Sequence, residues 1–186
     1  HGAPVQLDGR LDEEAWQRAE VAADFVQLQP EEGAAATERS EVRVLYGRDA
    51  LHVGFRAFDS DAEAIEAQLT RRDRDSFSDW VYVAVDSYND RRTAYQFGVN
   101  PLGVKRDIYH YDDTRTDPDW DAVWDVATSV DEQGWAAEFR IPYSQLRFAA
   151  AESQVWGLQL TREIARKSET SYWAPRSFED SGVVSK

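Results

Sequence analysis

Apolar residues recur at every second position through much of this chain, and this period-two alternation restricts the fold more than any other feature. In one segment, Val42, Val44 and Tyr46 alternate with Glu41 and Arg43. After a turn at residues 47–49, the alternation resumes through residues 51–57. Two alternating runs joined by a short turn predict an antiparallel hairpin whose valine and phenylalanine side chains face inward.

Alternation or a continuous apolar run predicts more strands at residues 80–86, 93–100, 104–111, 124–130, 135–141, 155–165 and 171–174. Helical spacing is limited to residues 12–18, where Asp12 is expected to cap and Trp16 to face the core, and to residues 61–69. Parallel strands would need crossover helices, so the pattern favours antiparallel pairing. We expect one domain over residues 1–186, an all-β, jelly-roll-like antiparallel β-sandwich with one or two short helices.

The formal net charge of −14 is spread along the chain. Such a surface repels nucleic acid and anionic membranes and attracts cations and basic proteins. The sequence has no cysteine, which excludes disulfides and thiolate chemistry. No apolar run approaches the roughly 18 residues of a membrane helix, so we expect no direct membrane insertion by this segment.

Catalytic signatures are absent from the sequence. There is no Gly-x-Ser-x-Gly nucleophile elbow, no His-Glu-x-x-His zinc motif and no P-loop. The 3 histidines offer little material for a metal site or a triad. We therefore expect a protein that binds a ligand or a partner and has no catalytic residue.

An acidic loop at residues 112–121 is a candidate metal site. Asp117, Asp119 and Asp121 have the alternate spacing that lets a bent loop direct several oxygens at one calcium ion. The loop differs from an EF-hand, because Ala122 and Thr128 occupy the positions that need glycine and glutamate. A solvated acidic turn is the alternative to a calcium site.

Large aromatic residues are candidates for sugar stacking, because exposed rings pack on the apolar faces of sugars. Most aromatic residues at alternate strand positions are expected in the core. Trp120 lies among three aspartates and a proline, so it is the residue most expected to be exposed.

The opening segment, Val5-Gln6-Leu7-Asp8-Gly9-Arg10-Leu11-Asp12-Glu13-Glu14-Ala15-Trp16, resembles the start of family-9 carbohydrate-binding modules. Residues 42–59, 79–86 and 135–142 are similar to later motifs of that group. Residues 86–97, 120–124 and 162–167 resemble most closely the first domain of large bacterial outer-membrane-associated proteins of unassigned function. The resemblance implies an exported protein, in the periplasm or at the extracellular face, and Gly182–Lys186 is expected to lead into a longer chain.

The resemblance also implies a sugar site with two stacking tryptophans. Here Phe77 falls at the first position and Trp173 at the second, and Arg176 is a candidate for hydrogen bonding to hydroxyls. The hydrogen-bonding glutamate and arginine of the family fall near Tyr82 and Gly98. Two hypotheses follow: a noncatalytic module that binds a polysaccharide, or a periplasmic domain that uses the same scaffold to bind a protein partner.

Overall fold

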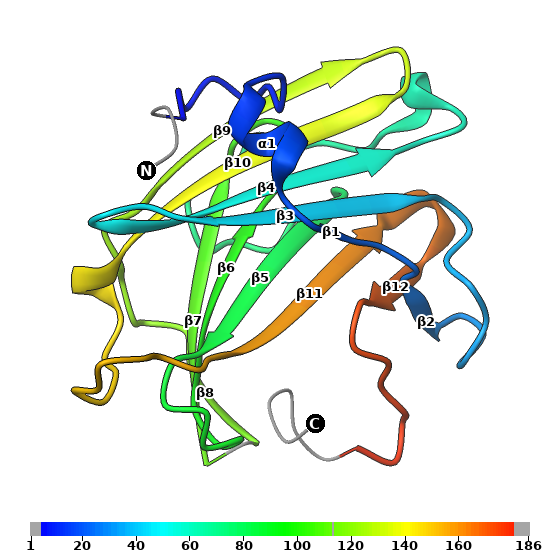
Figure 1. The fold of residues 1–186 in the computed structure, drawn as a ribbon. Coiled ribbons are helices and arrows are strands. Elements are labelled where there is room, and N and C mark those ends of the chain that lie inside the picture. The colour runs from blue at the N-terminus through cyan, green and yellow to red at the C-terminus, as the bar shows by residue number, and fades with distance from the viewer. Residues whose placement is uncertain (1–4, 113, 181–186) are drawn as a thin grey trace.

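The computed structural model describes residues 5–112 and 114–180, and its strands form two sheets that pack face to face (Figure 1). The 5-stranded sheet has the order β1 (Val21–Ala22), β3 (Ser40–Tyr46), β4 (Ala50–Phe58), β10 (Gly134–Pro142) and β9 (Asp125–Asp131). The 7-stranded sheet has the order β2 (Val26–Gln29), β12 (Glu169–Tyr172), β11 (Gly157–Ile164), β5 (Trp80–Asp86), β6 (Ala94–Val99), β7 (Lys105–Tyr111) and β8 (Arg115–Asp117). All the strand pairs are antiparallel, so the predicted β-sandwich is confirmed.

The predicted hairpin is the pair β3 and β4, in which Val44 lies opposite Val53. The core lies between the sheets, where every second residue of a strand points. In β5, Val81, Val83 and Val85 enter the core, so the intervening side chains must lie on the outer face of the 7-stranded sheet. This alternation places Tyr82 on that outer face.

Two local predictions need correction. The helix α1 spans Glu14–Arg18 and its N-cap is Glu13, which makes no side-chain cap, instead of Asp12. The helix expected over residues 61–69 is wrong, since only a 3-10 turn forms, at Ala62–Ala64. The backbone that follows makes long-range hydrogen bonds instead: the Asp79 N–H donates to the carbonyl of Glu66 at 2.7 Å. Two other 3-10 turns span Tyr143–Gln145 and Ala165–Lys167.

The opening motif is explained by one buried carboxylate on β10. Glu138 Oε2 accepts hydrogen bonds from the backbone N–H of Asp8 at 2.9 Å and of Gly9 at 2.7 Å. Glu138 Oε1 accepts a bond from Trp16 Nε1 at 3.0 Å. Gly9 has a φ of +84°, and a Cβ there would lie 2.7 Å from the carbonyl carbon of Thr128. The motif therefore docks the start of the chain onto the 5-stranded sheet.

Within the described residues, no helix is long and apolar enough to cross a membrane. The apolar run Gly182–Lys186, expected to continue into a longer chain, lies outside the described residues.

Candidate functional site

Polar and aromatic side chains gather on the outer face of the 7-stranded sheet. Tyr82 comes from β5, Arg106 from β7 and Glu163 from β11, and each points away from the core because of its place in the strand alternation. Trp80 precedes Tyr82 by two positions, and its ring stacks on the Tyr82 ring with centroids 5.9 Å apart. We call Trp80, Tyr82, Arg106 and Glu163 the outer-face cluster.

Hydrogen bonds link the polar members of the outer-face cluster. The Tyr82 hydroxyl donates to Glu163 Oε2 at 3.3 Å and accepts a bond from Arg106 Nη1 at 3.4 Å. The guanidinium of Arg106 also pairs with Asp75 and lies 4.9 Å from the centroid of the Trp80 ring. The cluster thus places a half-buried carboxylate acceptor and a half-buried guanidinium donor over the rings of Trp80 and Tyr82, which are only 2% and 4% exposed.

Burial changes the ionisation of this area. It raises the pKa of the Glu163 carboxyl, and the nearby Arg106 guanidinium opposes that rise. It also raises the pKa of the Tyr82 phenol well above its ordinary range, an effect that the Glu163 charge reinforces. A hydrogen bond from a hydroxyl donor stabilises such a half-buried carboxylate more than it would in water.

The two departures from the family pattern, Tyr82 and Gly98, are one structural feature. Tyr82 pairs with Gly98 across β5 and β6. A Cβ on Gly98 would lie 2.4 Å from two carbons of the Tyr82 ring. Gly98 therefore leaves the space that the Tyr82 ring occupies, and the charged groups of the face come from Arg106 and Glu163 instead.

Sequence reasoning missed Arg106 and Glu163. The available signal was the period-two alternation, because Arg106 and Glu163 each occupy a position in their strand from which the side chain points outward. Their proximity to Tyr82 depends on pairing between strands far apart in sequence, which periodicity does not give.

Two predicted sugar-binding residues flank this face. Phe77 is 55% exposed on the loop that leads into β5, and Asp75 on the same loop pairs with Arg106. At the other side, Arg176 lies 5.2 Å from the centroid of the Tyr172 ring. Tyr172 and Tyr82 are both register partners of Thr161, so they flank it across the sheet.

Trp173 lies elsewhere. Its backbone N–H donates to the carbonyl of Leu160 at 3.0 Å, and its side chain lines a cleft between the sheets near Val85, at the far end of β5 from Phe77. The structure therefore does not bring Phe77 and Trp173 together as a stacking pair.

Trp120 was expected to be exposed, but it is half-buried. Its ring packs on the buried rings of Tyr95 and Phe97 and on the partly buried ring of Tyr109, with centroid distances of 5.1, 5.7 and 6.4 Å. The surrounding aspartates are exposed while the indole turns inward. Burial of the large apolar ring outweighs the polarity of its neighbours in sequence.

The predicted calcium ligands lie on and beside the short strand β8. Asp117, Asp119 and Asp121 are exposed, and the Asp121 carboxylate pairs with Arg72 at 2.8 Å. Among residues 5–112 and 114–180, no group of three acidic or histidine side chains is placed to hold a metal ion. As they lie here, the three carboxylates do not converge, and calcium binding stays a prediction.

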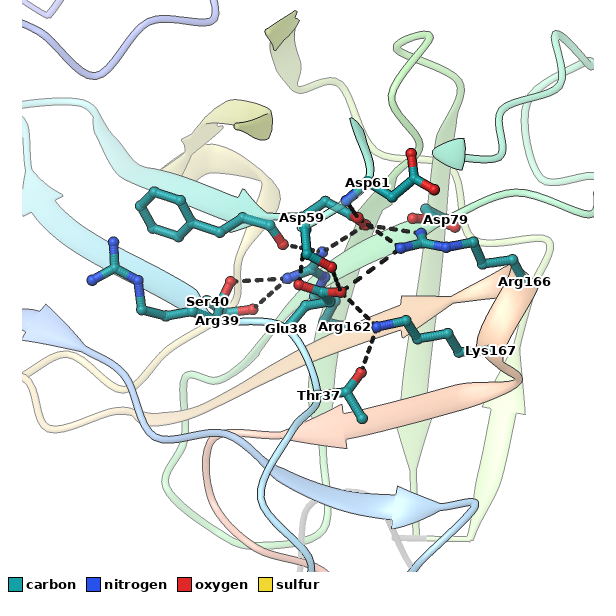
Figure 2. Close-up of polar contacts among 12 residues, drawn as sticks. Thr37, Glu38, Arg39, Ser40, Asp59, Asp61, Asp79, Arg162, Arg166 and Lys167 are labelled. Carbon is teal, nitrogen blue, oxygen red and sulfur yellow. Dashed lines mark hydrogen bonds and ion pairs between the residues drawn. The ribbon is translucent and has the colours of Figure 1, made fainter. Parts of the chain in front are cut away.

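A second polar cluster, drawn in Figure 2, fixes the strands that carry the outer-face cluster. Arg166 makes a two-pronged ion pair with Asp59, with N–O distances of 2.8 and 2.6 Å. The Lys167 ammonium lies 2.5 Å from Glu38 Oε1. These pairs hold the end of β11 to the ends of β3 and β4.

Arg162 and Asp79 form the buried part of this cluster. The Arg162 guanidinium donates to the carbonyls of Arg39 at 2.9 Å and Phe58 at 2.7 Å. Asp79, directly before β5, accepts a hydrogen bond from the Ala165 N–H at 3.0 Å. Burial raises the pKa of Asp79 to about 6, although that hydrogen bond and the charges of Arg162 and Arg166 lower it. The cluster sets β5 against β11 and so positions Tyr82 beside Glu163.

Solved structures with the same fold include a family-9 carbohydrate-binding module from Caldicellulosiruptor kristjanssonii in complex with cellotriose. It has a TM-score of 0.66 and 18% identity over 93% of this chain and 80% of that chain. The glucose complex of a family-9 module from that organism gives a TM-score of 0.65 and 18% identity over 93% and 82% of the two chains. A protein from Bacteroides uniformis, provisionally named a carbohydrate-binding protein, has a TM-score of 0.70 and 11% identity over 91% of this chain and 83% of that chain.

A comparison with curated protein sequences gives no significant match. The family model described as "Carbohydrate family 9 binding domain-like" matches residues 7–172. Binding modules of this kind are noncatalytic, which confirms the expectation that the chain is not an enzyme. The match covers most of the chain, which therefore belongs to the carbohydrate family 9 binding domain-like family.

Proposed function

We propose that this chain is a noncatalytic carbohydrate-binding module that binds a neutral saccharide on the outer face of its 7-stranded sheet. The observation that supports this most is the outer-face cluster, in which the half-buried Glu163 and Arg106 supply an acceptor and a donor that are joined through the buried Tyr82 hydroxyl. Sugar hydroxyls need both donors and acceptors, and an apolar ring face needs an aromatic neighbour.

Each polar member of the cluster has a role in this proposal. Among the described residues, the Tyr82 hydroxyl is the side-chain donor to Glu163, and a carboxylate has about four lone-pair sites. Glu163 therefore keeps acceptor capacity for a sugar hydroxyl. Arg106 has five N–H donors, of which Tyr82 and Asp75 use a part. Phe77, exposed beside the cluster, offers its ring to the apolar face of the sugar.

The charges favour a neutral ligand over an acidic polysaccharide. Glu163 and Asp75 flank the single guanidinium of Arg106, and the chain carries a net charge of −14. An anionic sugar would meet repulsion from both carboxylates and from the whole surface. Glucose and cellotriose, found in complexes of structures with this fold, are the first ligands to test.

Affinity electrophoresis through gels that contain soluble neutral polysaccharides tests the proposal. Retarded migration of the wild type is expected, together with loss of retardation in Phe77→Ala. Tyr88→Ala is the matched control, because Tyr88 is an aromatic residue of similar exposure, 48% against 55%, at the opposite end of β5. Equal migration of all three proteins in gels with and without polysaccharide would contradict the proposal.

We also infer export to the periplasm or to the cell surface. This location follows from the resemblance to the first domain of large outer-membrane-associated proteins. Fractionation of the native host with antibody detection tests it, and recovery in the cytosol alone would refute it.

A further inference from the structure

A cleft of about 710 Å³ opens between the two sheets, away from the outer-face cluster. Its floor is apolar and comes from both sheets: Val44, Leu51, Val85 and Leu158. Its walls are mainly aromatic: Tyr46, Tyr143, Phe148, Trp156 and Trp173. Pockets that hold small organic molecules typically measure about 300–1,000 Å³, so the cleft has the size of a ligand site.

The aromatic walls present ring surfaces and few free polar groups. Trp156 Nε1 donates to Gln154 Oε1 at 3.2 Å, and the Tyr143 hydroxyl donates to the carbonyl of Gly47 at 3.3 Å. The two rings meet edge to face, with centroids 5.9 Å apart. A sugar would find few hydrogen-bond partners on these walls, whereas an apolar body would be covered by them.

The wall residues also remain accessible to solvent. Tyr46 is 85% exposed and Trp173 is 37% exposed. Large aromatic side chains left accessible around one hollow usually mark a binding site. The cleft is therefore open to a ligand from outside.

The charge around the cleft selects the sign of the ligand. Among the described residues that line it, Glu20 is the one charged side chain, and none is a lysine, arginine or histidine. Glu20 is exposed, and the chain carries a net charge of −14. Aromatic ring faces also attract cations, through the negative face of the ring quadrupole. All three features favour a positive charge and disfavour a negative one.

We infer that this cleft is a second ligand site, separate from the proposed saccharide site, and that it binds hydrophobic organic cations. The apolar body of the ligand lies on the floor of the cleft between Trp156 and Trp173. Its cationic head faces Glu20 and the aromatic residues of the walls.

Three probes with one apolar body and different head groups test this inference: 4-phenylbutyltrimethylammonium, 4-phenylbutanol and 4-phenylbutyrate. Binding is followed by tryptophan fluorescence and by calorimetry at low salt. The cation is expected to bind tightest and the carboxylate weakest. The affinity for the cation should exceed the affinity for the alcohol by about two- to fivefold, as for an exposed charge pair.

The variant Glu20→Gln separates charge from burial. It should weaken binding of the cation toward the level of the alcohol and leave binding of the alcohol unchanged. Glu32→Gln is the matched control, since it removes the same charge from an exposed position that does not line the cleft. Trp173→Ala, with its fold checked by circular dichroism, should weaken all three probes.

Three results would overturn the inference: no binding of the cation at millimolar concentration, carboxylate binding as tight as cation binding, or equal effects of Glu20→Gln and Glu32→Gln. Glu163→Gln should leave the cation affinity unchanged, so failure of the saccharide site and failure of this site can be distinguished.

Discussion

The buried carboxyl of Asp79 makes the stability of this domain depend on pH in an unusual direction. Burial raises the pKa of Asp79 from an ordinary value of 3.8 to about 6. The folded state therefore binds this proton more tightly than the unfolded state does. Stability from this group is fully present below pH 3.8 and is lost as the pH rises through about 6.

The size of the effect follows from the two pKa values. One pKa unit corresponds to about 1.36 kcal/mol, so a rise from 3.8 to about 6 corresponds to about 3 kcal/mol in total. Asp79→Asn removes the titration, while its side-chain oxygen can still accept from the Ala165 N–H. Relative to the wild type, the free energy of unfolding of the variant should increase by about 2 kcal/mol between about pH 4 and about pH 7.

Urea unfolding followed by tryptophan fluorescence, at several pH values across that window, measures this difference. The difference matters more than the wild-type curve, because other groups also titrate there. One example is His52, whose pKa is lowered from 6.5 by burial, so its contribution to stability grows as the pH rises, in the direction opposite to that of Asp79. Asp119→Asn, at an exposed position, controls for the loss of one negative charge. A difference for Asp79→Asn that is constant, or that falls with rising pH, would refute the reasoning.

Three other predictions concern stability. Gly98→Ala should lower the free energy of unfolding by about 1–3 kcal/mol, because the new methyl group would overlap the Tyr82 ring. The double variant Gly98→Ala with Tyr82→Ala should lose less stability than the sum of the two single losses, and additive losses in urea unfolding would argue against this contact. Glu138→Leu should lower the free energy of unfolding by about 3 kcal/mol or more, because the N–H groups of Asp8, Gly9 and Trp16 lose their buried acceptor. A melting temperature equal to that of the wild type would contradict the docking of the opening motif. If Asp117, Asp119 and Asp121 bind calcium, as their spacing predicts, a chelator should lower the melting temperature of the native protein, and an unchanged value would dispose of the site.

Alternation along the chain predicted the strands well, because a half-buried strand displays its environment in its own sequence. The run at residues 80–86 coincides with β5, and the hairpin at residues 42–57 forms as expected. The strands β1, β2 and β8 were missed, because they have 2 to 4 residues each and too few positions for a period to appear.

Features that depend on tertiary contacts were not predictable in this way. Residues 61–69 have helix-favouring composition, yet the backbone of Glu66 and Gln68 bonds to Asp79 and Asn100 instead. Trp120 has polar neighbours in sequence, but its surroundings in the fold are aromatic. Local propensity is a weak prior when long-range partners compete for the same groups.

The candidate site illustrates the same limit. The resemblance to the family pointed to Phe77 and to positions 82 and 98. It did not reveal that Arg106 and Glu163 meet at Tyr82, because that meeting depends on how β7 and β11 are placed around β5. The resemblance also predicted that Phe77 and Trp173 form a pair. In the fold, Trp173 instead lines the cleft between the sheets.

Calorimetric titration of the intact chain with glucose and cellotriose tests the central proposal most directly, with Glu163→Gln and Tyr88→Ala measured beside the wild type. The wild type and Tyr88→Ala should bind with the same affinity, and Glu163→Gln should bind at least about tenfold more weakly, since a hydrogen bond to a charged group contributes about 1.5–3 kcal/mol. The absence of binding to both glucose and cellotriose would contradict the proposed saccharide recognition and favour a protein partner. Equal affinities for Glu163→Gln and the wild type would contradict the placement of the site on the outer face of the 7-stranded sheet.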